Sequence, residues 1–376
     1  MLLCCARLNR TAKRTDPSPD FFLPRPARVR QIVRVTSRKS NSAEILPTHT
    51  AALFDAAVQR AAGLLRAGEV VALPTETVYG LAANALDAQA VARIFEVKGR
   101  PSHNPIIIHV ADLAMAQKFV GDWPDAAEKL ARSFWPGPLT LVLPRAAGIP
   151  DIVTAGGPTV GVRWPSHPFM QAVIRECGFP LAAPSANPSN AISPTNAAHV
   201  RATLGARIKL IVDGGQSQVG IESTVVDVTS RPPVVLRPGM IHEESLLASL
   251  GEIGLRTSAG EDGGTLKSPG QLKKHYSPKA RLVMLTWKDD AELASLLVDL
   301  GATPAETQVI AYAHIPMIAG LGGVSVIPHD AEAYARALYG ELHRCDAEGA
   351  KWIVVEALPE GHEWQAIGDR LRRAAS

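Results

Sequence analysis

The stretch EVVALPTETVYG at residues 69–80 places a short β-branched run directly before a polar loop that opens with proline. Side chains that follow a buried strand lie where open α/β sheets usually bind ligands. Thr75 and Thr77 are therefore candidate ligand-binding residues, and helix N-capping is the alternative role for either. Other strands followed by polar loops along the chain are interpreted in the same way.

Similar apolar runs bounded by proline or glycine predict further strands. The predicted strands are EVVALP, NPIIIHV, LTLVLP, TVGVRW, PLAA, IKLIVD, STVVDV and PVVLRP. Residues 51–67 place apolar side chains at three- and four-residue spacing and stop at Gly68, as an amphipathic helix does. Further helices are predicted at 87–97, 111–119, 124–134, 167–176 and 241–250. The segment 47–255 is therefore expected to be a mixed α/β domain.

A second domain is predicted after a polar, glycine-rich segment that we interpret as a linker at 256–280. In residues 281–376 the runs RLVMLTW, QVIAYA, VSVIP and WIVVEAL alternate with helices near 289–300, 330–345 and 363–374. This alternation predicts a small doubly wound, Rossmann-like domain. No Gly-x-Gly-x-x-Gly turn follows its first strand, so nucleotide binding there is unsupported and a docking or lid role is open.

Length and composition exclude several classes of protein. The chain has 376 residues, of which 46% are hydrophobic and 20% charged, which is ordinary for a folded protein of about two domains. No stretch approaches the roughly 18 apolar residues of a membrane-spanning helix. The cysteines Cys4, Cys5, Cys177 and Cys345 form no zinc or redox spacing, so a disulfide scaffold and a cysteine-based metal site are excluded.

The positive charge is concentrated at the N-terminus. Residues 1–40 hold ten Lys or Arg against Asp16 and Asp20, net +8, which leaves 29 against 34, net −5, for the rest. We expect residues 1–46 to be a disordered basic extension, either inert or used for targeting or RNA contact. A net negative folded part argues against bulk nucleic-acid binding.

Four cations stand at predicted strand or helix ends beside glycine or proline. They are Lys98 and Arg100 in VKGRP, Arg163 in GVRWP and Arg237 in LRPG. Such placement holds a cation rigidly, which suits phosphates or carboxylates, whereas solvated turn residues are the alternative. No Walker loop, Gly-x-Ser-x-Gly elbow or His-Glu-x-x-His pair is present.

Polar groups occur at similar places. The loop APSANPSN at 183–190 offers Ser185, Asn187, Ser189 and Asn190, and turn chemistry alone is the alternative explanation. His109 interrupts the apolar run PIIIHV, and a core histidine is the more common explanation for such a residue taken alone. Glu222 and Ser223 stand at the entry of a strand, and exposed turn polarity is their alternative.

Together these strings resemble the YrdC-like threonylcarbamoyl-AMP synthases in their long two-domain form. The matching strings are PTETVYGL at 74–81, KGRPSHNPIIIHV at 98–110, WPGPLTLVL at 135–143, VGVRWPSHP at 160–168, PSANPSN at 184–190, ESTVVDV at 222–228, LRPG at 236–239 and the linker-like SPGQLKKHYSP at 268–278. The resemblance covers roughly residues 47–376. It implies a YrdC-like twisted mixed sheet with flanking helices, plus the small Rossmann-like domain.

The resemblance implies that L-threonine, bicarbonate and ATP give threonylcarbamoyl-AMP and pyrophosphate, for threonylcarbamoylation of the adenosine beside the tRNA anticodon. Magnesium is implied with ATP, without an organic cofactor. A downstream tRNA threonylcarbamoyl transferase complex is the implied partner, with weak tRNA contact as an open possibility. The location implied is cytoplasmic, and organelle targeting through the basic extension is the open alternative.

Site residues follow from the matching motifs. The resemblance implies L-threonine binding by Thr77, His109, Arg163, the Ala183 backbone and Ser223. It implies ATP binding by Arg100, Asn104, Thr159, Ser185, Ser193, Arg237 and Tyr276. Lys98 and Arg100 are the candidates for stabilising charge at the α-phosphate or carbamate, and Arg163 for holding the threonine carboxylate.

The linker differs from the archaeal pattern, because Gln271, Leu272 and Lys273 precede the His-Tyr pair. His275 and Tyr276 remain, so the linker is expected to fold back over the site mouth as a lid. Two alternative functions are open: a double-stranded-RNA or tRNA-binding module without synthase activity, and carbamoyl transfer as in hydrogenase maturation. The negative folded part disfavours the first, and no acylphosphatase or zinc-finger segment supports the second.

Overall fold

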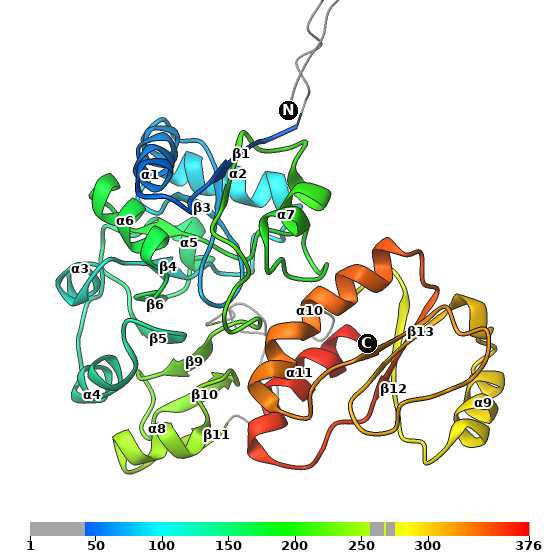
Figure 1. Ribbon diagram of the computed structural model, residues 1–376. Helices are drawn as coiled ribbons and strands as arrows, with labels where there is room; N and C mark the ends of the chain where they lie inside the picture. The colour runs from blue at the N-terminus through cyan, green and yellow to red at the C-terminus, as the bar shows by residue number, and fades with distance from the viewer. Residues whose placement is uncertain (1–41, 256–266, 268–274, 376) are drawn as a thin grey trace, which may run out of the picture. The chain divides into compact units, whose positions relative to one another are not determined.

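Two β-sheets organise the chain, of which the computed structural model describes residues 42–255, 267 and 275–375 (Figure 1). The strands of the larger sheet are, in spatial order, β1 (Glu44–Pro47), β8 (Leu210–Asp213), β2 (Val71–Leu73), β3 (Gly80–Asn84), β7 (Leu181–Ala182), β4 (Ile108–His109), β6 (Thr159–Arg163), β5 (Leu139–Pro144), β9 (Thr224–Asp227), β10 (Val234–Arg237) and β11 (Gly254–Leu255). Strand β2 pairs parallel with β8 and antiparallel with β3. The sheet is therefore mixed, and the predicted fold class is confirmed.

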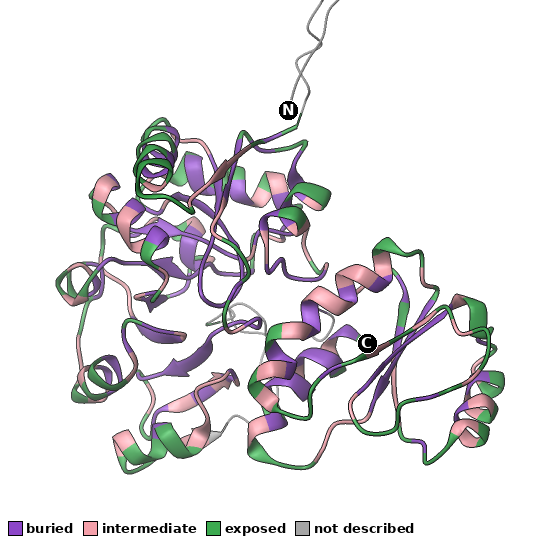
Figure 2. Cartoon of the chain, viewed as in Figure 1, coloured by how far each residue is buried: buried purple, intermediate pink, exposed green. Residues whose placement is uncertain are grey.

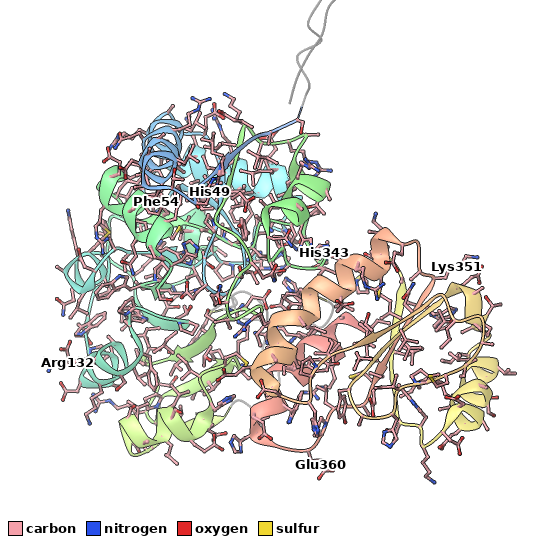
Figure 3. The ribbon with its side chains drawn as sticks, viewed as in Figure 1. His49, Phe54, Arg132, His343, Lys351 and Glu360 are labelled. Atoms are coloured by element: carbon pink, nitrogen blue, oxygen red, sulfur yellow. The ribbon has the colours of Figure 1, made fainter. Side chains whose placement is uncertain are left out.

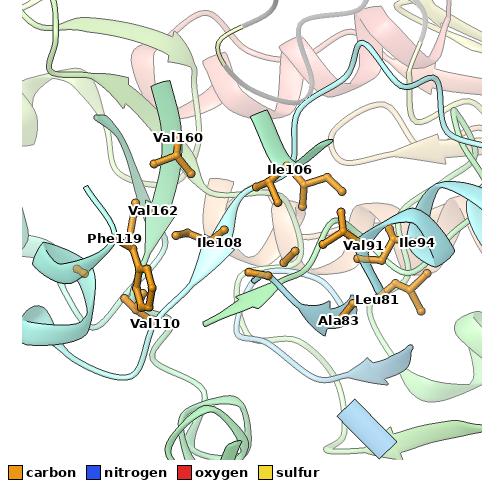
Figure 4. Close-up of a cluster of buried hydrophobic side chains, with 14 of the residues drawn as sticks. Leu81, Ala83, Val91, Ile94, Ile106, Ile108, Val110, Phe119, Val160 and Val162 are labelled. Atoms are coloured by element: carbon orange, nitrogen blue, oxygen red, sulfur yellow. The ribbon is translucent and has the colours of Figure 1, made fainter. Parts of the chain in front are cut away.

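Helices cover both faces of this sheet. They are α1 (Ala51–Arg66), α2 (Ala88–Lys98), α3 (Leu113–Lys118), α4 (Asp125–Phe134), α5 (Asp151–Thr154), α6 (Pro168–Cys177), α7 (Ala197–Leu204) and α8 (Glu243–Leu250). Alternate residues of a strand face opposite sides: Val71 and Leu73 join the core under α1 and α6, whereas Ala72 joins the one under α2. Figure 4 shows part of the second core, and Figure 2 shows the exposed outer face of α1.

Three strands of this sheet, β1, β3 and β11, escape sequence prediction. Strand β1 begins at Glu44 and pairs with β8, so regular structure starts before the predicted boundary at residue 46. The earlier part of the predicted extension, residues 1–41, lies outside the described residues. Strand β3 has the sequence GLAAN, whose glycine and alanines have low strand propensity. It forms because the strand lies between β2 and β7 in the sheet, where its side chains are buried.

The smaller sheet defines the C-terminal domain and is parallel throughout. Its strands are, in spatial order, β12 (Arg281–Leu285), β15 (Trp352–Glu356), β13 (Thr307–Ala311) and β14 (Gly323–Val326). Helix α9 (Asp290–Asp299) packs on one face, and α10 (Ala331–Ala347) and α11 (Gln365–Ala374) pack on the other. The short helices η1 (Pro304–Glu306) and η2 (His362–Trp364) complete it. The doubly wound domain is thus confirmed.

The described residues of the two sheets belong to one compact unit, in which the C-terminal domain contacts the domain of the larger sheet, here called the N-terminal domain. A single apolar cluster contains Ile192 and Ile221 of the N-terminal domain together with Tyr334 and Leu338 of α10. No helix among the described residues is long and apolar enough to span a membrane.

Candidate active site

A cavity in the N-terminal domain gathers most of the predicted site residues. Its empty volume is about 520 Å³, part of it open to solvent. The lining residues are Thr75, Thr77, Val78, Gly80, Arg100, Ile107, His109, Arg163, Ala183, Pro184, Ser185, Glu222, Ser223, Arg237, His275 and Tyr276. Three arginines and one glutamate make this lining strongly cationic.

Local structure explains how the arginines reach the cavity. Arg163 ends β6 and Arg237 ends β10, so each is held by sheet hydrogen bonds up to its own residue. Helix α2 ends at Lys98 because Gly99 adopts a left-handed conformation with φ of 62°, which glycine tolerates without strain. The chain then turns, and Arg100 enters the cavity wall.

Arg100 is a buried cation whose hydrogen bonds go to neutral oxygens. Its Nε donates to the Asn104 carbonyl at 3.1 Å, and its Nη2 donates to Asn104 Oδ1 at 2.7 Å and the Pro105 carbonyl at 2.8 Å. Burial, together with the nearby Arg237, lowers the pKa of Arg100 to about 10. It remains charged at neutral pH and can attract an anion that enters the cavity.

Arg163 forms a buried ion pair with Glu76, at 2.7 Å between Nη2 and Oε1. Burial alone would raise the pKa of Glu76, but Arg163 outweighs it and holds that pKa below its ordinary value. His109, which pairs with Arg163 across β4 and β6, has its pKa lowered to about 3, chiefly by burial and then by Arg163. The imidazole is therefore neutral at pH 7.

Arg237 is joined to Ser223. Its Nε donates to the Ser223 carbonyl and its Nη2 contacts Ser223 Oγ, both at 3.1 Å. Ser223 Oγ also lies 2.8 Å from Thr140 Oγ1. Elsewhere in the lining, Thr75 Oγ1 donates to the Val78 carbonyl at 2.6 Å and lies 2.9 Å from Thr77 Oγ1. These contacts fix the polar groups that face the cavity.

Four predicted site residues do not line the cavity. Lys98 Nζ donates to the carbonyls of Ser185 and Asn187, each at 2.5 Å, and so supports the loop that carries Ser185. Asn104 is buried behind Arg100, and Ser193 Oγ donates to Glu222 at 2.6 Å. Thr159 begins β6, opposite Pro144 of β5, at the end of that strand away from Arg163.

The His-Tyr pair at the end of the predicted linker lines the cavity. Tyr276 is 1% exposed and has φ of 63°, a left-handed conformation that is unusual for a bulky residue and often found at functional sites. The backbone N–H of Ser277 donates to the Asn190 carbonyl at 2.8 Å, which ties this segment to the N-terminal domain. Residues 256–266 and 268–274 lie outside the described part, so a lid stays a prediction.

Sequence reasoning singled out Thr75 and Glu222 but left both out of the predicted site. Glu222 could have been found, because an acidic residue directly before Ser223 stands in one of the matching strings. Among the described residues no cluster of His, Cys, Asp or Glu could hold a metal ion. The carboxylates of Glu76 and Glu222 are each engaged by an arginine, so neither makes a ready metal ligand.

The chain combines a mixed sheet that bears an arginine-lined cavity with a second domain formed around a parallel sheet. These features define a class of two-domain α/β proteins whose cavity suits anions. The Sua5, YciO and YrdC family model, described as telomere recombination, matches residues 63–239. A model described as threonylcarbamoyl-AMP synthase, C-terminal domain, matches residues 241–376. Curated relatives name the family more closely.

Threonylcarbamoyl-AMP synthase of Pyrococcus abyssi is 40% identical to this chain over 327 residues, covering 85% of the chain and 94% of the relative. That of Bacillus subtilis is 40% identical over 329 residues, covering 85% and 93%. The chain therefore belongs to the threonylcarbamoyl-AMP synthase family. A solved structure of P. abyssi Sua5 complexed with L-threonine has a TM-score of 0.80 and 38% identity, covering 88% of this chain and 96% of that one.

Proposed function

We propose that this chain is an L-threonylcarbamoyladenylate synthase, which converts L-threonine, bicarbonate and ATP into threonylcarbamoyl-AMP, pyrophosphate and water. In a chain of this family, the observation that carries the proposal is the convergence of Arg100, Arg163 and Arg237 on one buried cavity. Each of the three substrates bears an anionic group, and buried guanidinium groups bind carboxylates and phosphates strongly.

The chemistry requires positioning more than proton transfer. The threonine amine takes up CO2 derived from bicarbonate as a carbamate, with net loss of water. A carbamate oxygen then attacks the α-phosphorus of ATP, and the bond to the bridging oxygen breaks to release pyrophosphate. Fixed cations that hold carboxylate, carbamate and triphosphate together lower the barrier by orientation and by stabilising developing charge.

Residue roles within the cavity belong to the proposal. Its shared lining supports L-threonine contacts from Thr77, His109, Arg163, Ala183 and Ser223. It likewise supports ATP contacts from Arg100, Ser185, Arg237 and Tyr276. Direct ATP contacts by Asn104, Thr159 and Ser193 stay predictions, because none of the three lines the cavity.

Magnesium is proposed to enter with ATP, coordinated by phosphate oxygens and water, because Glu222 in the cavity lining and Glu76 beside Arg163 are already engaged by arginines. The product is proposed to pass to a tRNA threonylcarbamoyl transferase complex, and a cytoplasmic location stays a prediction. The relatives support synthase activity and not the RNA-binding alternative.

The experiment is to measure pyrophosphate release from ATP and bicarbonate with L-threonine, L-serine or no amino acid. Threonine-dependent release is expected, with serine slower by tens- to hundreds-fold, because a pocket for one methyl group contributes about 1–3 kcal/mol. Folded protein that releases no pyrophosphate under any of these conditions would contradict the proposal, and a salt-dependent tRNA titration would then test the alternative.

A further inference from the structure

Glu222 is the one acidic residue in the described cavity lining, and the C-terminal domain holds its carboxylate. Oε2 accepts hydrogen bonds from Arg370 Nε of α11 at 2.8 Å and from the Tyr339 hydroxyl of α10 at 3.0 Å. Oε1 accepts from Ser193 Oγ of the N-terminal domain at 2.6 Å. Three donors from two domains thus fix one carboxylate at the cavity wall.

Arg370 also binds two backbone carbonyls, each belonging to a residue next to a cavity residue in the chain. Its Nη2 donates to the carbonyls of Glu222 at 3.3 Å and Pro238 at 3.0 Å. Glu222 directly precedes Ser223, and Pro238 directly follows Arg237. Arg237 and Ser223 are hydrogen-bonded to each other. The Arg370 guanidinium therefore holds a backbone carbonyl next to each member of this pair.

Burying the charges of Arg370 and Glu222 costs free energy unless both groups are well paired. The Arg370 side chain is 0% exposed, and Nη1 donates to Asp369 Oδ2 at 2.8 Å. Burial alone would raise the pKa of Glu222, but Arg370, then Arg237 and the hydrogen bonds outweigh it, so the group is ionised at neutral pH. Apolar packing around Ile221 already joins the domains, and a buried ion pair is seldom needed for stability alone.

A second contact from α10 holds the same region. His343 Nε2 lies 3.2 Å from the Ser193 carbonyl (Figure 3). The His343 ring stacks on that of His199, with centroids 3.9 Å apart. Ser193 is therefore held at its carbonyl by the C-terminal domain and at its hydroxyl by Glu222.

We infer that Arg370, assisted by Tyr339, is a positioning residue for the nucleotide, acting through Glu222 to set Ser223 and Arg237 at the cavity wall. The inference rests on the proposed function. It gives the C-terminal domain a defined part in the reaction: residues of α10 and α11 complete the ATP-binding surface without themselves contacting the reacting atoms.

The test compares steady-state kinetics of full-length variants. Arg370→Gln should raise KM for ATP at least tenfold, with a smaller change in KM for threonine, because a charge pair that anchors Arg237 is broken. Arg370→Lys should recover part of that loss, since lysine restores the positive charge but lacks the planar guanidinium group with its several N–H donors. Tyr339→Phe, which removes only one hydroxyl, should raise KM for ATP about fivefold.

Matched controls separate positioning from packing. Tyr334→Phe removes a buried hydroxyl on the same helix that has no hydrogen-bond partner among the described residues. Arg336→Gln removes an exposed arginine that donates to the Gln218 carbonyl across the same interface at 2.7 Å. Both should keep KM for ATP within about twofold of the parent value, as surface and unpaired groups do.

A double-mutant cycle gives the decisive reading. If Arg370 acts through Glu222, Arg370→Gln should change KM for ATP less than twofold further in a Glu222→Gln background. Additive effects, or folded Arg370→Lys and Tyr339→Phe proteins with parental KM, would overturn the inference. If the parent protein releases no pyrophosphate, the proposed function fails, and ATP affinity by calorimetry on the same variants then decides the inference.

Discussion

At the scale of single residues, Lys98 takes a different position from the other three predicted cations, and its role at the α-phosphate or carbamate stays a prediction. The sequence marks it as a rigid cation near phosphates, yet its ammonium group binds two backbone carbonyls and lies outside the cavity lining. Burial, and then Arg100, lower its pKa. We interpret Lys98 as the support of the loop that carries Ser185.

Replacing Lys98 by alanine should therefore impair ATP use and also destabilise the fold. Two buried carbonyls would lose their donor, at about 1–3 kcal/mol for each unsatisfied group. Lys98→Ala should lower kcat/KM for ATP at least tenfold and lower the melting temperature, measured by pyrophosphate release and thermal denaturation. Lys129→Ala, at an exposed site on α4, is the control. Parental melting temperature and activity for Lys98→Ala would contradict this role.

Most cavity residues could be predicted because their signal is local. Arg100, Arg163 and Arg237 each stand within two residues of a glycine or proline near an element end, and that arrangement is visible in the sequence. Arg370 could not be predicted, because it stands in a helix beside Arg372 and Arg373 and nothing local distinguishes it. Its partner Glu222 is 148 residues away in the chain.

At the scale of elements, the close approach of α10 to a loop depends on Gly220. This residue has φ of 86°, and a Cβ there would lie 2.4 Å from both the Ala335 carbonyl oxygen and Arg336 Cα. Only glycine therefore permits both the backbone conformation and the packing. The loop leads directly into Ile221 and Glu222, so the same approach brings Tyr339 to the Glu222 carboxylate.

Gly220→Ala should accordingly push helix α10 away from the loop that contains residue 220. Gly156 has φ of 77° with no atom within 4 Å of its Cβ position, so Gly156→Ala measures the backbone cost alone, about 1–2 kcal/mol. Gly220→Ala should lower the free energy of unfolding by at least about 2 kcal/mol more, because overpacking adds its own cost. Denaturant unfolding of both variants checks this, and equal losses would show that α10 moves away without cost.

Both kinds of element were predicted incompletely: the short helices α5 and α7 escaped prediction, as did strands β1, β3 and β11. The span predicted at 51–67 forms α1 at Ala51–Arg66, because amphipathic spacing persists over several turns. Strand β3, in which one glycine and two alanines make up three of five residues, shows no alternating pattern. Its place in the sheet is set by neighbours distant in the chain, which pattern reasoning does not reveal.

At the scale of the whole molecule, buried neutral histidines should make stability fall in mild acid. Burial, as the main cause, lowers the pKa of both His109 and His275 to about 3, against 6.5 for an ordinary histidine. Below pH 6.5 the unfolded chain binds protons that the folded chain does not, so stability decreases as the pH falls toward 3. At pH 5 the loss is about 2 kcal/mol for each histidine.

Thermal denaturation between pH 7 and pH 5 measures this effect. The melting temperature should fall over that interval, above the range in which most carboxylates titrate. His275→Gln should reduce the slope, whereas His49→Gln, at an exposed position labelled in Figure 3, should leave it unchanged. A melting temperature that stays constant from pH 7 to pH 5 would contradict the assignment of neutral buried histidines.

The contact between Glu222 and Arg370 also bears on the order of folding. Contacts between residues far apart in a chain form late, because closing the intervening loop costs entropy. Each sheet can assemble from its own continuous segment, as domains of larger proteins generally do. Because Arg370 is inferred to position ATP-binding residues, the nascent N-terminal domain folds before it binds nucleotide well. Competence for ATP then arrives only when α11 has been synthesised and has docked.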